Sequence, residues 1–147
     1  MGFPKEKIKK YILDYLEKNR LMTLATSEND VPWAATVFFA YDDDLNIYFI
    51  SVPNTRKITN LNRNPNVAIA INQFQPKGEV VQGLQIEGKA EALDKEKNKK
   101  ELDLYRKRYD WADKYLHDHE LYKIKPEKVY YLDDEKFGAG GREELEL

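Results

Sequence analysis

Hydrophobic positions at the start of the chain recur at helical spacing. Ile8, Ile12, Tyr15 and Leu16 lie three and four residues apart, and Lys and Glu fill most positions between them. This is the spacing of one face of an α-helix. The pattern therefore predicts an amphipathic helix over residues 4–19 that buries one side.

Six later segments have the pattern of β-strands. They are rich in β-branched and aromatic residues and are bounded by Gly, Pro, Asn or Asp. Most are joined by tight turns, and Gly83 and Gly88 predict bulges or tight bends of the kind that close barrels. The predicted strands are Leu21 to Thr26, Trp33 to Tyr41, Leu45 to Ser51, Asn66 to Gln73, Glu79 to Leu93 and Tyr122 to Leu132.

Helices interrupt the strand pattern twice more. A short helix is predicted over residues 55–63, where an Asn-Pro pair ends it, and residues 95–119 are predicted to form one bent helix or two. The last fifteen residues contain three glycines and predict an irregular tail. There is no internal repeat and no linker. We therefore expect residues 1–147 to form a single antiparallel β-barrel domain decorated by helices.

Composition and charge narrow the classes of function. The 147 residues carry a net charge of −2, and 34% are charged, which gives no bias towards nucleic acid or an anionic membrane. The absence of cysteine excludes disulfides, thiolate metal sites and thiol catalysis. No apolar run is long enough for a signal peptide or a membrane span, so we expect a cytoplasmic protein.

The clearest chemical signal is a pair of cations at the start of the short helix. Arg56 and Lys57 follow Thr55 in its first turn. That turn has unpaired N–H groups and a partial positive charge, so cations are unfavourable there unless an anion lies nearby. A bound phosphate would resolve the conflict, and Thr55 adds a hydroxyl donor. We predict a phosphate site here; the alternative is an ordinary solvated helix end.

Histidine and aspartate give no comparable signal for a metal. His117 and His119 are two residues apart in a predicted helix, about 200° around its axis, so they cannot readily share one ion. The run from Asp42 to Asp44 lies between two strands, where aspartate is an ordinary turn residue. We expect no metal ion.

Several of these segments, taken in order, are similar to a known family. The Asn-Thr-Arg-Lys of residues 54–57, the Asn-Pro-Asn-Val of 64–67 and the Gln-Ile-Glu-Gly-Lys-Ala-Glu of 85–91 resemble the pyridoxamine 5′-phosphate oxidase-like group of FMN-binding split barrels. The resemblance covers residues 21–93 well and the remainder loosely. It implies a mainly β fold with a six-stranded antiparallel split β-barrel, and a homodimer holding FMN in clefts between its subunits.

The resemblance also implies which residues bind the cofactor. Arg56 and Lys57 correspond to the pair that grips the flavin phosphate, Thr55 is their hydroxyl neighbour, and Ser51 is the hydroxyl that ends the preceding strand. A cation near the flavin ring would stabilise the anionic reduced form. The predicted ring contacts are Ala35, Thr36, Val37, Gln82 or Gln85, and Arg142 of the partner subunit.

The C-terminal region departs from the true pyridoxamine phosphate oxidases. Those enzymes have an Arg-x-His pair and a tryptophan there, whereas this chain has neither after Trp111. Vitamin B6 oxidation is therefore not expected. A haem-utilisation branch of the group also exists, and the two histidines here are poorly placed to support it.

The function predicted is that of an FMN-dependent oxidoreductase acting on a small-molecule redox substrate. The flavin would perform the redox step, so no side chain need act as nucleophile. Two alternatives stay open: a non-catalytic flavin-binding or sensing protein, and a deazaflavin-dependent reductase on the same barrel.

Overall fold

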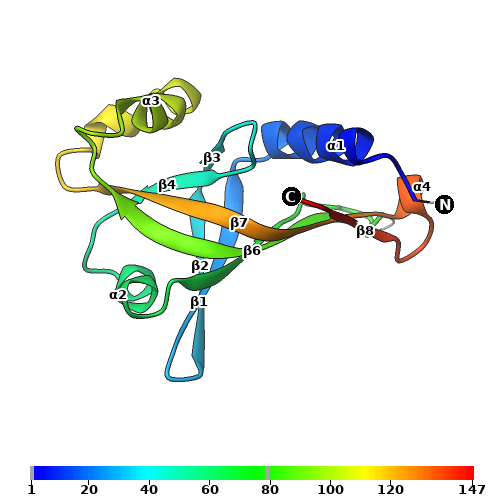
Figure 1. Ribbon diagram of the computed structural model, residues 1–147, viewed down its shortest axis with the longest axis horizontal. Coiled ribbons are helices and arrows are strands. Elements are labelled where there is room, and N and C mark those ends of the chain that lie inside the picture. The colour runs from blue at the N-terminus through cyan, green and yellow to red at the C-terminus, as the bar shows by residue number, and fades with distance from the viewer. Residues whose placement is uncertain (1, 79) are drawn as a thin grey trace.

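The computed structural model describes residues 2–78 and 80–147, whose strands form one antiparallel sheet. The strand order is β2-β1-β5-β6-β7-β4-β3, and β8 pairs with β7 (Figure 1). The strands are β1 (Leu21–Glu28), β2 (Val31–Phe38), β3 (Ala40–Tyr41), β4 (Ile47–Ser51), β5 (Asn66–Ile71), β6 (Gln82–Leu93), β7 (Glu120–Asp133) and β8 (Arg142–Leu145). The helices are α1 (Lys5–Lys18), α2 (Arg56–Arg63), α3 (Lys99–Arg108), the 3-10 helix η1 (Ala112–Lys114) and α4 (Asp134–Phe137).

The sheet curls into a split barrel, as the positions of β2 and β3 require. These strands lie at opposite ends of the strand order, yet only Phe39 separates them in the chain. In Figure 1, β1 and β2 accordingly run across the direction of β6 and β7. Phe39 is fully buried in a core that also contains Ile12 and Leu16 of α1. Helix α1 therefore covers part of the barrel core.

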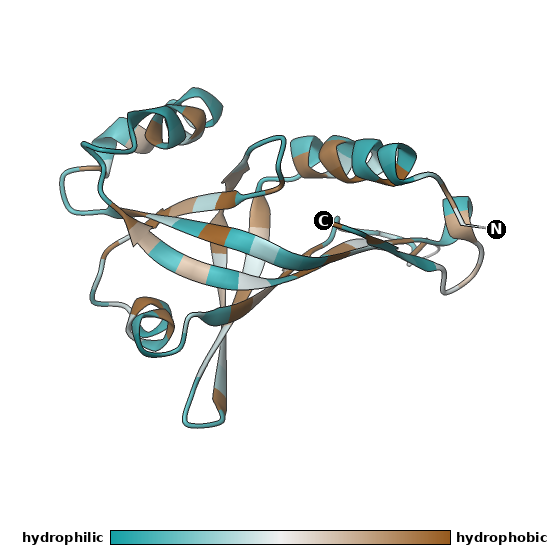
Figure 2. Ribbon diagram, viewed as in Figure 1, coloured by the Kyte–Doolittle hydropathy of each residue, from teal (hydrophilic) through white to brown (hydrophobic). Residues whose placement is uncertain are grey.

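Strand β4 is buried on both of its faces. Ile47 and Phe49 belong to the barrel core, whereas Tyr48 and Ile50 belong to a second cluster that includes Tyr105 of α3. Side chains alternate between the faces of a strand, so the four successive buried residues from Ile47 to Ile50 require a cover on each side. Helix α3 and η1 supply the outer cover. In Figure 2, the ribbons of α1 and α3 alternate between hydrophilic and hydrophobic colours, as expected of helices with one buried side.

The fold class, the first helix and the short helix predicted from the sequence are confirmed, and the number of strands is corrected. The described residues form eight strands in place of six, because β3 and β8 are additional. The strand predicted from Trp33 to Tyr41 breaks at Phe39, where the chain turns the corner of the barrel. Residues 95–119 contain α3 followed by η1. Glu79, the predicted start of the fifth strand, lies outside the described residues.

The prediction of an irregular C-terminal tail was wrong, because this region forms α4 and β8. Asp133 is fully buried, and its carboxylate accepts hydrogen bonds from the backbone N–H groups of Glu135 and Lys136, which caps α4. The same carboxylate accepts hydrogen bonds from Gln82 and from the Tyr131 hydroxyl. A buried polar group thus organises the region, and hydrophobic periodicity does not report such a group.

The pairing of β6 with β7 shifts register at Gly88, as predicted. Gly88 pairs with Pro126, whereas Glu87 pairs with Lys128. Glu127 of β7 is therefore the extra residue of a bulge. Pro126 lacks a backbone donor. On the other side of β7, β4 pairs with residues 120–124 and β8 pairs with residues 129–132. Neither strand pairs with Pro126, so its missing N–H group costs no ladder hydrogen bond on that side.

We expect Gly88→Ala to destabilise the barrel. A Cβ atom at this position would lie 2.4 Å from the backbone oxygen of Lys125, so β7 would have to move. Overpacking of this kind costs about 1–3 kcal/mol. Gly83→Ala is the matched control, since Gly83 pairs in register and its Cβ would lie 3.4 Å from the Ile71 oxygen. Equal midpoints for the two variants in urea unfolding would contradict this account.

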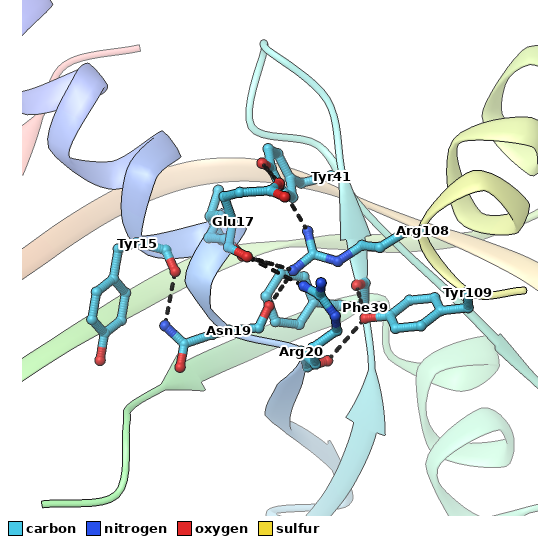
Figure 3. A network of polar contacts seen from close by, with 9 residues as sticks. Tyr15, Glu17, Asn19, Arg20, Phe39, Tyr41, Arg108 and Tyr109 are labelled. Carbon is cyan, nitrogen blue, oxygen red and sulfur yellow. Dashed lines mark hydrogen bonds and ion pairs between the residues drawn. The ribbon is translucent and has the colours of Figure 1, made fainter.

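A buried arginine joins α3 to the end of α1 (Figure 3). The Arg108 guanidinium donates hydrogen bonds to the backbone oxygen atoms of Leu16 and Asn19. It also lies 5.1 Å from the ring centroids of both Phe39 and Tyr41. The Leu16 carbonyl also accepts from the Asn19 N–H, so Arg108 adds a second donor there and supplies a donor to the carbonyl of the C-cap residue Asn19, which fixes α3 relative to α1.

Candidate functional site

Strand β4 leads directly to the start of α2. Ser51 ends the strand and is buried, and Thr55 is the N-cap residue of the helix. The Thr55 side chain does not cap the helix; its hydroxyl lies 3.5 Å from both the Val52 carbonyl oxygen and the Ser51 hydroxyl. The first turn of α2 contains no acidic residue. Its N–H groups therefore lack the acceptors that N-cap side chains and carboxylates ordinarily supply.

Lys57 places a half-buried ammonium against these hydroxyl groups. Its Nζ atom donates to Thr55 Oγ1 at 3.3 Å. Burial disfavours the charged form and lowers the pKa of Lys57 below its ordinary value. The ion pairs formed within residues 2–78 and 80–147 include neither Lys57 nor Arg56. An anion bound here would compensate for the desolvation of the ammonium.

Arg56 lies on the exposed side of the same helix start. Its guanidinium stacks on the Trp33 ring of β2, with 4.2 Å between the guanidinium carbon and the ring centroid. Arg56 also lines a hollow of about 510 Å³, together with Asn54 and Thr59. A cation–π stack positions the guanidinium without using its N–H donors, which stay directed to other acceptors.

Ser51, Thr55, Arg56 and Lys57, which lie within one strand-turn-helix segment, are here named the anion cluster. The cluster combines two hydroxyl groups, two cations and the first N–H groups of a helix. These are the groups that bind phosphoryl oxygen atoms in proteins. The structure therefore brings Ser51, Thr55 and Lys57 into contact, whereas Arg56 stacks on Trp33 beside them.

A second hollow, here named the aromatic pocket, lies between the sheet and the segment that follows α3. Its volume is about 450 Å³. On the sheet side its lining includes Ile50 of β4, which directly precedes Ser51, the first residue of the anion cluster. Its lining includes Thr36, Val37 and Ile50 from the sheet, and Trp111, Tyr115 and His119 from the segment after α3.

Strand β2 connects the anion cluster with the aromatic pocket. Trp33 stacks on Arg56 at one end, and Thr36 and Val37 line the pocket at the other. Ala35 is half-buried between them. At about 3.3 Å per residue, Trp33 and Val37, whose side chains share one face of the strand, are about 13 Å apart. The site thus matches a ligand with an anionic end and a flat ring system separated by an extended chain.

The other residues predicted to contact the ring lie elsewhere. Arg142 donates to the side-chain oxygen of Gln85 at 3.2 Å, and both line a hollow of about 290 Å³ on the exposed face of the sheet. Gln82 donates its side-chain amide to the buried Asp133. Within one chain, these residues line neither the aromatic pocket nor the hollow beside Arg56.

The sequence pattern did not identify Trp33, Trp111 or His119 as site residues. Trp33 has the position of an ordinary strand residue, and His119 was weighed only as a metal ligand. Trp111 and Tyr115 are four residues apart, a spacing that places two side chains on one side of a helix. That spacing does not distinguish ordinary packing from a pocket wall, which only the fold shows.

Neither a metal centre nor a membrane span was found in the part of the chain that the structure describes. No group of three or more His, Cys, Asp or Glu side chains within residues 2–78 and 80–147 is arranged to hold a metal ion. Asp42 instead organises a turn by accepting hydrogen bonds from the N–H groups of Asp44 and Asn46. None of the described helices combines the length and apolar character that crossing a bilayer requires.

Comparisons with known proteins identify the family. The family model for pyridoxamine 5′-phosphate oxidase matches residues 8–133. A curated relative, the UPF0306 protein PM1958 of Pasteurella multocida, is 30% identical over 104 residues, which make up 68% of this chain and 68% of that protein.

Solved structures share the fold at low sequence identity. A FAD-binding protein from Mesorhizobium loti superimposes with a TM-score of 0.65 at 23% identity, covering 82% of this chain and 90% of that one. The haem storage protein HutZ of Vibrio cholerae gives a TM-score of 0.71 at 16% identity, covering 80% of this chain and 89% of that one. Together with the family match over residues 8–133, the split barrel shows that the chain belongs to the pyridoxamine 5′-phosphate oxidase-like family.

Proposed function

We propose that this protein is an FMN-binding flavoprotein and an oxidoreductase acting on a small molecule. The observation that carries the proposal is the anion cluster, in which a half-buried ammonium and two hydroxyl groups lie at the start of α2. FMN has a phosphate, an extended ribityl chain and a flat ring in the same order as the cluster, β2 and the aromatic pocket. A relative that binds a flavin, the Mesorhizobium loti protein, has the same fold.

The residues present fit FMN at both ends. Lys57 and Thr55 provide charge-assisted and hydroxyl contacts for the phosphate. Val37 and Ile50 provide an apolar floor for the ring, and Thr36 provides a hydroxyl group at its edge. The flavin supplies the electron transfer chemistry when bound, while these residues hold its phosphate, orient its ring and exclude water from one of its faces.

The proposal includes a homodimer. Small side chains, Ala25, Ala68 and Ala70, surround the pair of Gln85 and Arg142 on the exposed face of the sheet, and they permit close approach of another subunit. In this dimer, Arg142 of the partner subunit supplies a cation for the reduced flavin. Sedimentation equilibrium tests the assembly: twice the 17.3 kDa chain mass supports it, and a monomer that binds FMN in full contradicts it.

An FMN titration followed by absorbance and flavin fluorescence tests the cofactor. We expect stoichiometric uptake, and a folded protein that takes up haemin or a deazaflavin but no FMN would overturn the assignment. Anaerobic addition of NADH or NADPH to the FMN complex then tests the enzyme. Bleaching of the flavin supports a reductase, whereas bound flavin that neither nucleotide reduces supports the alternative of a non-catalytic flavin-binding protein.

The half-buried Lys57 makes phosphate binding sensitive to alkaline pH. Its pKa lies below the ordinary value of 10.5, and only the protonated ammonium attracts phosphate. The ratio of FMN affinity to riboflavin affinity should therefore fall as the pH rises through the lowered pKa, before pH 10.5 is reached. Deprotonation of the flavin ring affects FMN and riboflavin equally, so its effect cancels in the ratio of the two affinities.

Lys57→Arg is the control for this pH dependence. Its guanidinium stays charged, so the ratio should remain high over the same pH range. A wild-type ratio that stays level up to pH 10.5 would count against a phosphate contact by Lys57.

A further inference from the structure

We propose that the side of the aromatic pocket facing away from β2 binds the substrate, and that the substrate is a planar aromatic molecule with a hydroxyl group. This inference rests on the proposed function, because it assigns the substrate class of the flavoprotein. Ligand binding can be measured without turnover, so this inference and the proposed function can fail separately.

Aromatic rings form the wall that the segment after α3 contributes. The Trp111 ring centroid lies 5.2 Å from that of Phe38 and 5.9 Å from that of Tyr115, both in edge-to-face geometry. Tyr115 is 46% exposed, which places it at the rim. Walls of this kind favour flat aromatic molecules, since rings prefer offset or edge-to-face contacts with one another.

His119 gives the pocket a polar end. Its Nδ1 atom lies 2.6 Å from the Asp118 carboxylate, and its ring packs edge-to-face against Tyr115 at 5.5 Å. A carboxylate only accepts hydrogen bonds, so the neutral imidazole carries its proton on Nδ1 and a lone pair on Nε2. In this tautomer Nε2 is an acceptor, and a ligand hydroxyl group is the donor that matches it.

The backbone of His119 is held in place from the other side. The Lys95 ammonium donates to the carbonyl oxygen atoms of Leu116 at 2.7 Å and His119 at 2.9 Å. The His119 side chain is 22% exposed, whereas that of His117 is 74% exposed and does not line the pocket. The two histidines thus differ in role, and His117 offers a matched control.

Calorimetric titration with 2-naphthol and 2-methoxynaphthalene tests the proposal. The two probes have the same rings, but only 2-naphthol has a hydroxyl donor. The wild-type protein, saturated with FMN and also without it, should bind 2-naphthol about five-fold more tightly, the effect of one net hydrogen bond. His119→Phe should abolish this preference, whereas His117→Phe should retain it. Tyr115→Ala should weaken the binding of both probes.

The outcomes separate the parts of the proposal. Equal affinity of the wild type for both probes, or a preference that survives in His119→Phe, would overturn the polar end. Unchanged binding of both probes to Tyr115→Ala would overturn the location. Circular dichroism of each variant checks folding, which should persist because both side chains line an open pocket. Normal FMN binding without 2-naphthol binding would overturn this inference alone. Binding of 2-naphthol without FMN binding would support the pocket as a site for aromatic hydroxyl compounds and overturn the proposed function.

Discussion

Replacing Lys57 by Met and Arg56 by Gln together should weaken FMN binding by at least about 100-fold, because each cation that donates to a phosphate contributes about 1.5–3 kcal/mol. Riboflavin has the same ring and no phosphate, so its affinity should change little. Equilibrium titration of both ligands by flavin fluorescence measures the difference. The result would assign the phosphate to the anion cluster, independently of any contact made by the ring.

Arg63→Gln is the control for this experiment. Arg63 is a cation at the other end of α2, where it pairs with Glu28 and its side chain is 66% exposed. Its loss should leave the affinities for both ligands unchanged. The double variant should also unfold no earlier than the wild type, because partial burial of the Lys57 ammonium opposes folding. A double variant that keeps the wild-type FMN affinity would contradict the phosphate site.

Arg108→Met should lower the free energy of unfolding by about 1–3 kcal/mol, since it leaves the Asn19 carbonyl without its guanidinium donor and removes the stacked guanidinium. The Arg108 side chain is only 9% exposed, and Nη1 is 3.8 Å from the Glu17 carboxylate, too far for a hydrogen bond. The contacts that matter are therefore those with the Leu16 and Asn19 carbonyls and with the rings of Phe39 and Tyr41. Urea unfolding followed by circular dichroism measures the effect.

Arg106→Met is the matched control for Arg108→Met. Arg106 lies two residues earlier on α3, where its guanidinium is exposed and pairs with Asp103 and Asp113. Ion pairs of this kind at the surface contribute little, so the unfolding midpoint should hardly change. An equal loss of stability in both variants would show that Arg108 has no special role in joining α3 to α1.

The parts of the site that are local in sequence could be predicted, and the parts that depend on long-range contacts could not. Ser51, Thr55, Arg56 and Lys57 fall within one strand-turn-helix segment, so their proximity follows from local structure. The aromatic pocket joins residues near 36, 50 and 119, which only the curl of the sheet and the packing of α3 bring together. No periodicity reports that kind of contact.

Part of the fold was predictable for the same reason. The helical spacing of Ile8, Ile12 and Leu16 anticipated α1, because a buried face leaves a periodic record in the sequence. The tail was not anticipated, because the buried carboxylate of Asp133 organises α4 and this residue type is typical of exposed turns. Gln82, for which a flavin contact was predicted, donates a hydrogen bond to the same carboxylate.

The comparison of FMN with riboflavin on the wild-type protein tests the central claim most directly. Both ligands would be titrated at neutral pH under identical conditions, with flavin fluorescence as the signal. If the anion cluster holds the cofactor phosphate, FMN should bind at least about 100-fold more tightly than riboflavin. Equal affinities would contradict the claim, because the phosphate would then have no partner on the protein.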